Sequence, residues 1–322
     1  MAMTQEQAEW FADTFDKLNK NVSVAVLGKN RPVSLVLTAL LAGGHVLLED
    51  VPGTGKTSLA RALANTVQGT SSRIQFTPDL LPSDVTGVNI YDQRTGRFDF
   101  HKGPIFASIV LADEINRASP KTQSALLEVM EEQHVTVDGV QYGVGAPFMV
   151  IATQNTIEQV GTYRLPEAQL DRFLMKTSLG YPDHETSVQI LGDATVRDRA
   201  AAVEPLITSK AVTEMALLAD TVHVDAAMLS YISRVAEETR QAPDVRLGVS
   251  IRGCLAAVRC IKVWAAAHRR TYAIPDDLKD LVEPLFGHRV LLDPEAEFRG
   301  VNPLQVLSRI VQDVKPPVER AA

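Results

Sequence analysis

The feature that most constrains this chain is the run HVLLEDVPGTGKT at residues 45–57, where an apolar stretch leads into a glycine-containing loop and then a helical pattern. Gly53 and Gly55 tolerate backbone conformations that other residues avoid, so backbone N–H groups can approach an anion closely. A helix that begins near Lys56 presents its positive end at the same point. This order of strand, loop and helix predicts a loop that binds the phosphates of a nucleotide.

Two side chains of this run suit the same chemistry. Lys56 is expected to reach the β- and γ-phosphates, and the Thr57 hydroxyl to ligate Mg²⁺, which prefers oxygen ligands. The strict pattern has Gly at position 50, where this chain has Asp50. A chance Gly-Thr-Gly-Lys-Thr turn stays the alternative for this run taken alone.

Length and composition describe a packed protein of about two domains. The 322 residues are 45% hydrophobic and 22% charged, which excludes a wholly disordered or collagen-like chain. The formal net charge of −7 provides no general basic field for nucleic acid or anionic lipid, although a local basic patch stays open. Cys254 and Cys260 lie six residues apart in a helical pattern and predict core thiols.

The sequence also gives an expectation about location. The most apolar stretch, residues 35–48, is interrupted by polar residues and glycines and is shorter than the ~20 residues that cross a bilayer. The N-terminal segment MAMTQEQAEWF has acids and glutamines where an export signal requires basic residues and then an apolar run. We therefore expect a cytoplasmic protein without a membrane span.

Short apolar runs alternate with helical patterns in the first half of the chain. The clearest helical patterns cover residues 56–67 and 121–132. The predicted buried strands are residues 45–49, 73–77, 107–112, 148–153 and 173–179. This alternation predicts an α/β fold on a five-stranded parallel sheet.

Two segments break the alternation and are predicted to be β-hairpins inserted into this fold. In residues 135–142, alternating apolar residues flank Asp138-Gly139, a strong hairpin signal. In residues 88–100, we expect apolar residues of two strands to face each other across a polar turn that ends at Gly96: Val88 and Ile90 on one strand, Phe98 and Phe100 on the other. Ordinary edge decoration of a sheet is the alternative for either hairpin alone.

After residue 182 helical periods replace the strand pattern and predict a smaller all-α domain. We expect residues 1–185 to form the α/β core with an N-terminal helix. Residues 186–322 are expected to form a linker and the helical domain, with a frayed tail from residue 315.

A second buried run, residues 108–114, ends in two adjacent carboxylates, which is the Walker B arrangement. Asp113 can hold a Mg²⁺-bound water, and Glu114 can polarise the water that attacks the γ-phosphate. A solvated strand end is the alternative for such a pair in isolation. The spacing from Lys56 suits one sheet, so hydrolysis is favoured over binding alone.

Two more polar residues follow later strands. Asn155 ends the run at 148–155 and has the donor and acceptor needed to orient a water, although alone it would be a turn residue. Arg172 lies between a short helical segment and the last strand, where a guanidinium could meet γ-phosphate charge. A surface or Asp-paired arginine is the alternative.

Together these segments resemble AAA+ ATPases of the MoxR family. The resemblance extends from about residue 26 to residue 289 and is carried by residues 73–87, 102–106, 113–118 and 152–155. It implies that Asn155 is sensor 1, that Arg172 is an arginine finger acting on a neighbour's nucleotide, and that the hairpins are the family's two inserts. Residues 247–252 match the sensor 2 segment with Ile251 in place of the usual Pro, which makes Arg252 the candidate, in cis or in trans.

The resemblance further implies Mg²⁺-dependent hydrolysis of ATP by a homo-oligomeric ring, expected to be a hexamer, that remodels, activates or helps to assemble client proteins. A client or partner with a von Willebrand factor A domain is one expectation from the family. The implied catalytic residues are Lys56, Glu114, Asn155 and Arg172, with Thr57 and Asp113 at the metal. The implied nucleotide-binding residues are Pro52, Gly53, Thr54, Gly55, Lys56, Thr57, Ser58, Asp113 and Arg252.

Three alternative functions differ from this one in partner or in chemistry. A metal-chelatase motor subunit would share every motif and differ only in its partner. A nucleic-acid translocase is disfavoured because residues 135–142 contain no Lys or Arg and the two arginines of the other hairpin are balanced by two aspartates. A scaffold that binds nucleotide without hydrolysis is disfavoured by the presence of Glu114, Asn155 and Arg172.

Overall fold

The computed structural model describes residues 2–154, 162–163, 165–193 and 198–317. The chain divides into two compact units, each assembled from segments that are distant in sequence. One unit comprises Leu18–Arg172 and Thr177–Thr213, and the other comprises Met1–Lys17, Phe173–Lys176 and Glu214–Ala322. The division between residues 185 and 186 that the sequence suggests stays a prediction.

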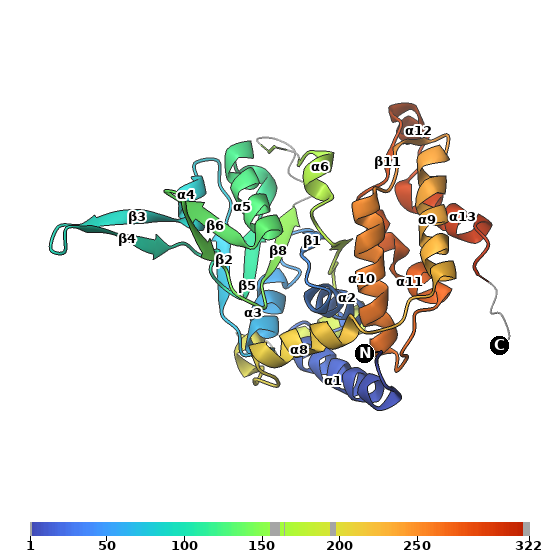
Figure 1. Ribbon diagram of the computed structural model, residues 1–322, viewed down its shortest axis with the longest axis horizontal. Helices are drawn as coiled ribbons and strands as arrows, with labels where there is room; N and C mark the ends of the chain where they lie inside the picture. Colours follow the sequence, from blue (N-terminus) through green and yellow to red (C-terminus); the bar gives the residue numbers. More distant parts are fainter. Residues whose placement is uncertain (1, 155–161, 164, 194–197, 318–322) are drawn as a thin grey trace. The chain divides into compact units, whose positions relative to one another are not determined.

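Five strands form the central sheet: β1 (Val46–Glu49), β2 (Ser71–Gln75), β5 (Ile109–Asp113), β8 (Met149–Gln154) and β9 (Met175–Thr177). Their order is β2-β5-β8-β1-β9. The first four of these strands are labelled in Figure 1. The pairs β2–β5, β5–β8 and β1–β8 are parallel. The predicted five-stranded α/β fold is confirmed, and its last strand is shorter than the predicted 173–179.

The central strands β5 and β8 are apolar up to their carboxyl ends because both of their faces are covered. Every residue of β5 is buried, as is every residue of β8 except the last. The helices α3 (Lys56–Thr66) and α5 (Pro120–Glu132) correspond to the predicted helical patterns. At the start of α5, Pro120 occupies the first turn and the Ser119 hydroxyl accepts a hydrogen bond from the Thr122 N–H at 3.4 Å.

The strand order places the glycine-containing loop at a reversal in the sheet. β1 lies between β8 and β9, while α3 carries the chain from β1 to β2 at the far edge. In open α/β sheets, ligands bind at the carboxyl ends of strands beside such a reversal. The residues that follow β1 are therefore at the expected ligand site.

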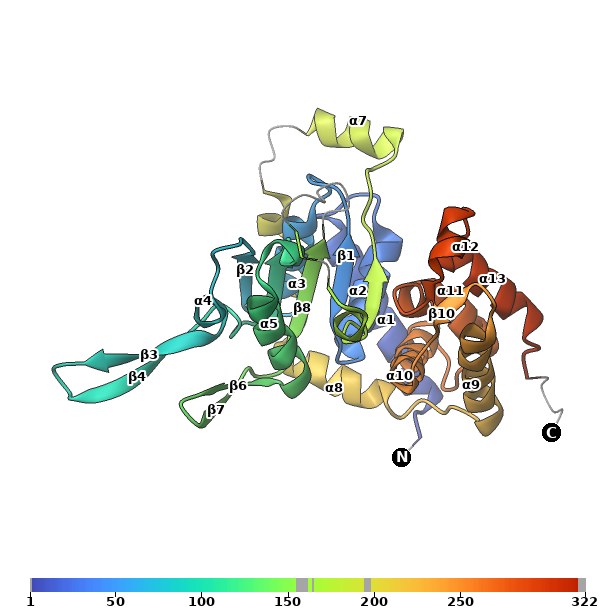
Figure 2. The ribbon, with the colours of Figure 1, turned by 90° about the horizontal axis from the view of Figure 1, so that it is seen from above.

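The two predicted hairpins are present and project on the same side of their unit (Figure 2). The first consists of β3 (Gly87–Asp92) and β4 (Arg97–Lys102), and the second of β6 (His134–Val137) and β7 (Val140–Gly143). In the second, Asp138 and Gly139 have φ values of 50° and 80°, as a tight hairpin turn requires.

The predicted pairing within the first hairpin is wrong by one residue. Val88 pairs with His101 and Ile90 with Asp99. Phe98 and Phe100 pair instead with Tyr91 and Asn89, so the two apolar pairs lie on opposite faces. The cause is a four-residue turn, 93–96, which makes Asp92 and Arg97 the last pair and is closed by the Gly96 N–H donating to the Asp92 carbonyl at 2.8 Å.

The shifted register brings the two hairpins into contact. The Phe100 and Tyr142 rings stack with centroids 4.1 Å apart, and the Asn89 amide donates to the Asp138 carboxylate at 2.6 Å. Toward the tip, Tyr91 and Phe98 stay largely exposed, at 52% and 69%. The first hairpin therefore presents an aromatic face to solvent.

The helical unit contains the predicted helices together with one short antiparallel pair of strands. Amphipathic helices bury their apolar stripes against each other, with Tyr231, Cys260 and Phe286 among the fully buried side chains. Its complete helices are α9 (Ala226–Gln241), α10 (Ile251–Ala267), α11 (Pro275–Phe286), α12 (Pro294–Phe298) and α13 (Pro303–Asp313), and its strands are β10 (Val245–Leu247) and β11 (Leu291–Leu292).

The remaining helices either lie in the sheet-bearing unit or, as α1 and α8 do, contain residues of both units. They are α1 (Gln5–Ser23), α2 (Asn30–Leu41), α4 (Pro82–Thr86), the 3₁₀ helix η1 (Ile115–Arg117), α6 (Glu167–Leu170), α7 (His184–Gly192), the 3₁₀ helix η2 (Arg199–Ala202) and α8 (Ser209–Ala219). Among the residues that the structure describes, no helix combines the length and apolar character that a bilayer crossing needs.

Cys260 is a buried core thiol, as the sequence predicts, and His45 is a buried structural residue. Both cysteines are free, and burial raises the pKa of the Cys260 thiol to about 12. Cys254 is half-buried. His45 is buried, with Nδ1 accepting from the Val150 N–H at 2.9 Å and Nε2 2.9 Å from the Met130 carbonyl oxygen, which fits a neutral ring.

The base of the first hairpin depends on Gly87, so Gly87→Ala should destabilise the protein. A Cβ atom there would lie 2.2 Å from the His101 carbonyl oxygen, and φ is +97°. We expect a loss of about 2 kcal/mol or more in the free energy of unfolding, measured by chemical denaturation. Gly143→Ala is the control, since its Cβ meets no atom within 4 Å. Equal losses in both variants would contradict this explanation.

Candidate active site

The glycine-containing loop has the geometry of a phosphate-binding loop. Gly53 and Gly55 have φ values of 85° and 95°, and α3 begins directly after them at Lys56. The Lys56 ammonium donates a hydrogen bond to the Val51 carbonyl at 2.9 Å, across the loop. The backbone N–H groups at the start of α3 and the positive end of the helix therefore converge on one place.

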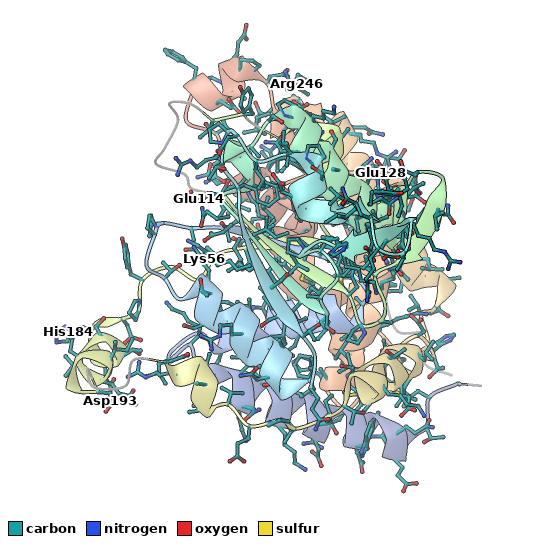
Figure 3. All side chains as sticks on the ribbon, turned by 90° about the vertical axis from the view of Figure 1, so that its left-hand side faces the viewer. Lys56, Glu114, Glu128, His184, Asp193 and Arg246 are labelled. Carbon is teal, nitrogen blue, oxygen red and sulfur yellow. The ribbon has the colours of Figure 1, made fainter. Side chains whose placement is uncertain are left out.

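A pocket of about 260 Å³ opens beside this loop at the carboxyl ends of β1, β5 and β8. Lys56 and Glu114, labelled in Figure 3, both belong to its wall. The pocket is lined by the glycine-containing loop, by both Walker B carboxylates and by three polar side chains from β2 and β8. Its lining residues are Asp50, Pro52, Gly53, Thr54, Gly55, Lys56, Thr57, Ser58, Arg73, Gln75, Asp113, Glu114 and Thr153.

Asp50, the departure from the strict loop pattern, is a buried anchor. Its side chain is 5% exposed, and its two carboxylate oxygens accept backbone N–H bonds from Leu179 at 2.6 Å and Gly180 at 2.8 Å. Charge-assisted hydrogen bonds of this kind are stronger than neutral ones. Asp50 therefore ties the beginning of the loop to the segment that follows β9, which a glycine could not do.

Asp113 is held at the end of β5 by two neighbours. The Thr153 hydroxyl donates to Asp113 Oδ1 at 2.7 Å, and the Arg73 guanidinium donates to Oδ2 at 2.6 Å. Arg73 comes from β2 and Thr153 from β8, the strands on either side of β5. The carboxylate is thus fixed from both sides of its own strand.

Glu114 has an unusual backbone and a well-fixed side chain. Its φ and ψ are 57° and 48°, in the left-handed region that costs a non-glycine residue roughly 1–3 kcal/mol. Its N–H donates to the Thr153 hydroxyl oxygen at 2.8 Å. Its Oε2 accepts from Gln75 and from Arg117, each at 2.9 Å. Such strain persists only where surrounding contacts enforce it, and it is concentrated at functional sites.

The pocket offers oxygen donors of the kind that Mg²⁺ takes. The Thr57 hydroxyl and the Asp113 carboxylate both line it. Within the described ranges, no cluster of three or more His, Cys, Asp or Glu side chains forms a metal site by itself. This donor set fits Mg²⁺ bound with substrate phosphates and waters better than a metal enclosed by protein ligands.

Two predicted site residues, Arg172 and Arg252, are not part of the pocket lining, and a third is not described. Asn155 lies outside the described residues. Arg172, the predicted arginine finger, forms an ion pair with Nε 3.1 Å from Glu131 Oε2, and it is absent from the pocket lining given above. Its partner is therefore Glu131 and not the Asp of the alternative interpretation. Arg252 is exposed in the first turn of α10, in the helical unit.

Four polar residues of the site carried no individual role in the sequence interpretation. Arg73, Gln75, Arg117 and Thr153 each contact Asp113 or Glu114. Arg73 and Gln75 are alternate residues of β2, which places them on one face, and β2 precedes β5 by more than thirty residues. The sequence does show these alternating polar residues in a predicted strand. Only the pairing of β2 with β5, however, shows that their side chains contact Asp113 and Glu114.

Comparison with known proteins defines the class of this site. Residues 45–175 match a family described as ATPase family associated with various cellular activities, and residues 237–310 match the AAA lid domain. The crystal structure of a Cytophaga hutchinsonii protein assigned as an ATPase superposes with a TM-score of 0.90 at 35% identity, covering 97% of this chain and 98% of that one. The chain is therefore an AAA+ ATPase, which binds and hydrolyses ATP.

Relatives over nearly the full length narrow the family. An uncharacterized protein of Bacillus subtilis, YeaC, is 47% identical over 95% of this chain and 96% of its own. Chaperone MoxR1 of Mycobacterium tuberculosis is 38% identical over 94% of this chain and 82% of its own, and Protein MoxR of Methylorubrum extorquens is 29% identical over 94% and 95%. The chain belongs to the MoxR family of AAA+ ATPases.

The anchoring role of Asp50 can be tested by substitution. Asp50→Ala leaves the Leu179 and Gly180 N–H groups without their acceptors, and we expect a loss of about 3 kcal/mol in the free energy of unfolding with weaker ATP binding. Asp50→Asn keeps one amide oxygen and should lose less in both measurements. Denaturation and fluorescent-nucleotide titration provide the data, and unchanged values for the alanine variant would contradict the role.

Proposed function

We propose that this ATPase acts as a ring of identical subunits, six by family expectation, in which Mg²⁺-dependent ATP hydrolysis remodels, activates or helps to assemble client proteins. One observation carries the proposal. The pocket brings together the phosphate-binding loop and both Walker B carboxylates, whereas Arg172 is paired with Glu131 and contributes nothing to the pocket lining of its own chain. An arginine finger placed in this way would act on the nucleotide of a second copy.

In this proposal each residue at the loop has a separate task. The N–H groups around Gly53 and Gly55 and the Lys56 ammonium bind the phosphates. Mg²⁺, held by the Thr57 hydroxyl and by Asp113 directly or through water, would neutralise charge on the phosphate oxygens. Thr153 keeps the Asp113 carboxylate directed at the pocket through its 2.7 Å hydrogen bond.

Glu114 is proposed as the group that accepts a proton from the attacking water. It lines the same pocket as Lys56 and Thr57, and its contacts to Gln75 and Arg117 fix the direction of its carboxylate. Asn155 would orient the same water, and Arg252 would bind nucleotide in cis or in trans. These assignments follow from the family resemblance.

The hairpins are the proposed contact with clients. Tyr91 and Phe98 are exposed on the first, and the second, 135–142, has no basic side chain. An aromatic face beside a hairpin without basic side chains suits a protein surface better than a phosphate backbone. A protein with a von Willebrand factor A domain is the client or partner that the family suggests, and the role of a metal-chelatase motor subunit is the alternative.

Glu114→Gln should retain ATP binding and lose hydrolysis, because the amide keeps its place in the pocket but cannot accept a proton from water. We expect ATP to favour a larger species of this variant in light scattering, since the nucleotide stays uncleaved. Lys56→Ala is the matched control, which should lose tight ATP binding. Turnover at the wild-type rate in Glu114→Gln would refute its role.

The same variant identifies the partner class. After ATP is added, proteins that co-purify with Glu114→Gln but not with Lys56→Ala are candidate clients. Recovered nucleic acid, with an affinity that falls steeply with salt concentration and is lost when residues 135–142 are shortened, would favour a translocase.

Subunit mixing tests the position of Arg172. Arg172→Ala should bind ATP nearly normally and lose about 10³-fold in rate, the low end for arginine fingers. If the finger acts in trans, mixed rings of Arg172→Ala and Glu114→Gln subunits contain interfaces with one intact copy of each residue, and activity should rise above that of either parent. Mass spectrometry verifies mixed assembly. No recovery in verified mixed rings would show that Arg172 acts in its own subunit.

A further inference from the structure

A buried arginine of the helical unit, Arg289, holds the chain segment that directly follows Arg172. The Arg289 side chain is 5% exposed. Its Nη2 donates to the Phe173 carbonyl oxygen at 2.7 Å, and its Nη1 donates to the Leu174 carbonyl oxygen at 3.2 Å. The two peptide groups after the proposed finger are therefore bound by one guanidinium.

The same guanidinium is bound to one helix of its unit, and its side chain packs closely against a second. Nη1 also donates to the Leu285 carbonyl oxygen in the last turn of α11. The aliphatic part of the side chain passes the first turn of α10, where a Cβ atom added to Gly253 would lie 2.9 Å from Arg289 Cδ and 3.2 Å from Nε. Gly253 directly follows Arg252. Arg289 therefore lies between Gly253 and residues 173 and 174, which follow Arg172.

The surroundings of Arg289 contain a second buried polar group. His288 Nε2 lies 2.8 Å from Arg289 Nη1. Burial and the neighbouring Arg289 charge lower the pKa of His288 well below its usual range, so the ring is neutral. The buried Arg289 guanidinium links residues 173 and 174 rigidly to α11. Displacing it would leave the carbonyl oxygens that it binds without their donor.

Arg172 itself is the last residue of the sheet-bearing unit before the chain enters the helical one. Its N–H donates to the Gln169 carbonyl at 3.2 Å, and its side chain pairs with Glu131. One peptide bond, about 3.8 Å between Cα atoms, separates it from Phe173. A shift of residues 173 and 174 therefore moves the backbone that carries the finger.

We propose that Arg289 is a positioning residue for Arg172. By binding the Phe173 and Leu174 carbonyls against α10 and α11, it sets the place from which Arg172 reaches the neighbouring subunit's nucleotide. This inference rests on the proposed role of Arg172. A finger must be placed to within a fraction of an ångström, since a displacement of about 1 Å can cost 10²-fold in rate.

Arg289→Lys is the first variant, because it keeps the positive charge and one hydrogen-bonding head but lacks the planar fork that reaches several carbonyls. We expect kcat to fall roughly 10- to 100-fold while nucleotide affinity stays within about threefold of wild type. Adding Arg289→Lys to Arg172→Ala should then cost little more, because there is no finger left to misplace.

The double variant separates positioning from general structural damage. If the losses of Arg289→Lys and Arg172→Ala multiply in the double variant, Arg289 acts independently of Arg172 and the inference is wrong. If Arg172→Ala alone turns over like wild type, the proposed finger fails and this inference falls with it. The two failures are therefore distinguishable in one set of rate measurements.

Gly253→Ala provides a second route if Arg289→Lys does not fold. Gly253 has an ordinary helical backbone, so alanine is tolerated there, but its Cβ must displace the Arg289 side chain or Val249 Cγ1, which would lie 2.7 Å away. We expect the same fall in kcat and the same lack of further loss in combination with Arg172→Ala. Gly192→Ala, whose Cβ meets no atom within 4 Å, is the matched control and should keep wild-type rates.

Subunit mixing gives the final readout. Arg289→Lys subunits keep Glu114 and supply a misplaced finger, whereas Glu114→Gln subunits supply an intact one. Verified mixed rings should therefore exceed both parents in ATPase activity. A defect confined to the Arg289→Lys subunit's own nucleotide site would give no recovery and would overturn the proposal.

Discussion

The parallel pairing of buried strands is the constraint on which the rest of this structure depends. β5 and β8 are covered on both faces, so polar side chains are tolerated only where these strands end. Parallel strands end at the same edge, which brings Asp113, Glu114 and Thr153 beside the loop that follows β1. The position of these three residues in the active site is thus a consequence of burying the sheet.

Within that edge, buried hydrogen bonds give the site its shape. Thr153 donates to Asp113 and accepts from the Glu114 N–H, so one hydroxyl fixes both acidic residues. Asp50 fixes the loop through two backbone N–H groups. A buried polar group without its partner costs about 1–3 kcal/mol, so these bonds favour one arrangement over its alternatives.

The hairpins show how a small local feature controls a large surface. A four-residue turn places the Phe98 and Phe100 side chains opposite Tyr91 and Asn89, on the face where Phe100 stacks on Tyr142. A turn that shifted the register by one residue would move every one of these side chains to the other face. The aromatic surface available to a protein partner is therefore set by turn geometry.

The sequence by itself determined the α/β class, the loop around Lys56, the Asp113-Glu114 strand end and both hairpins, because each depends on residues close together in the chain. Only the tertiary structure decided which residues far apart in the chain contact each other. Arg73 from β2 holds Asp113, and Arg289 holds the Phe173 carbonyl, separated by 40 and 116 residues. Periodicity reports which face of an element is buried but carries no information on what it is buried against, so such contacts follow only from the packed fold.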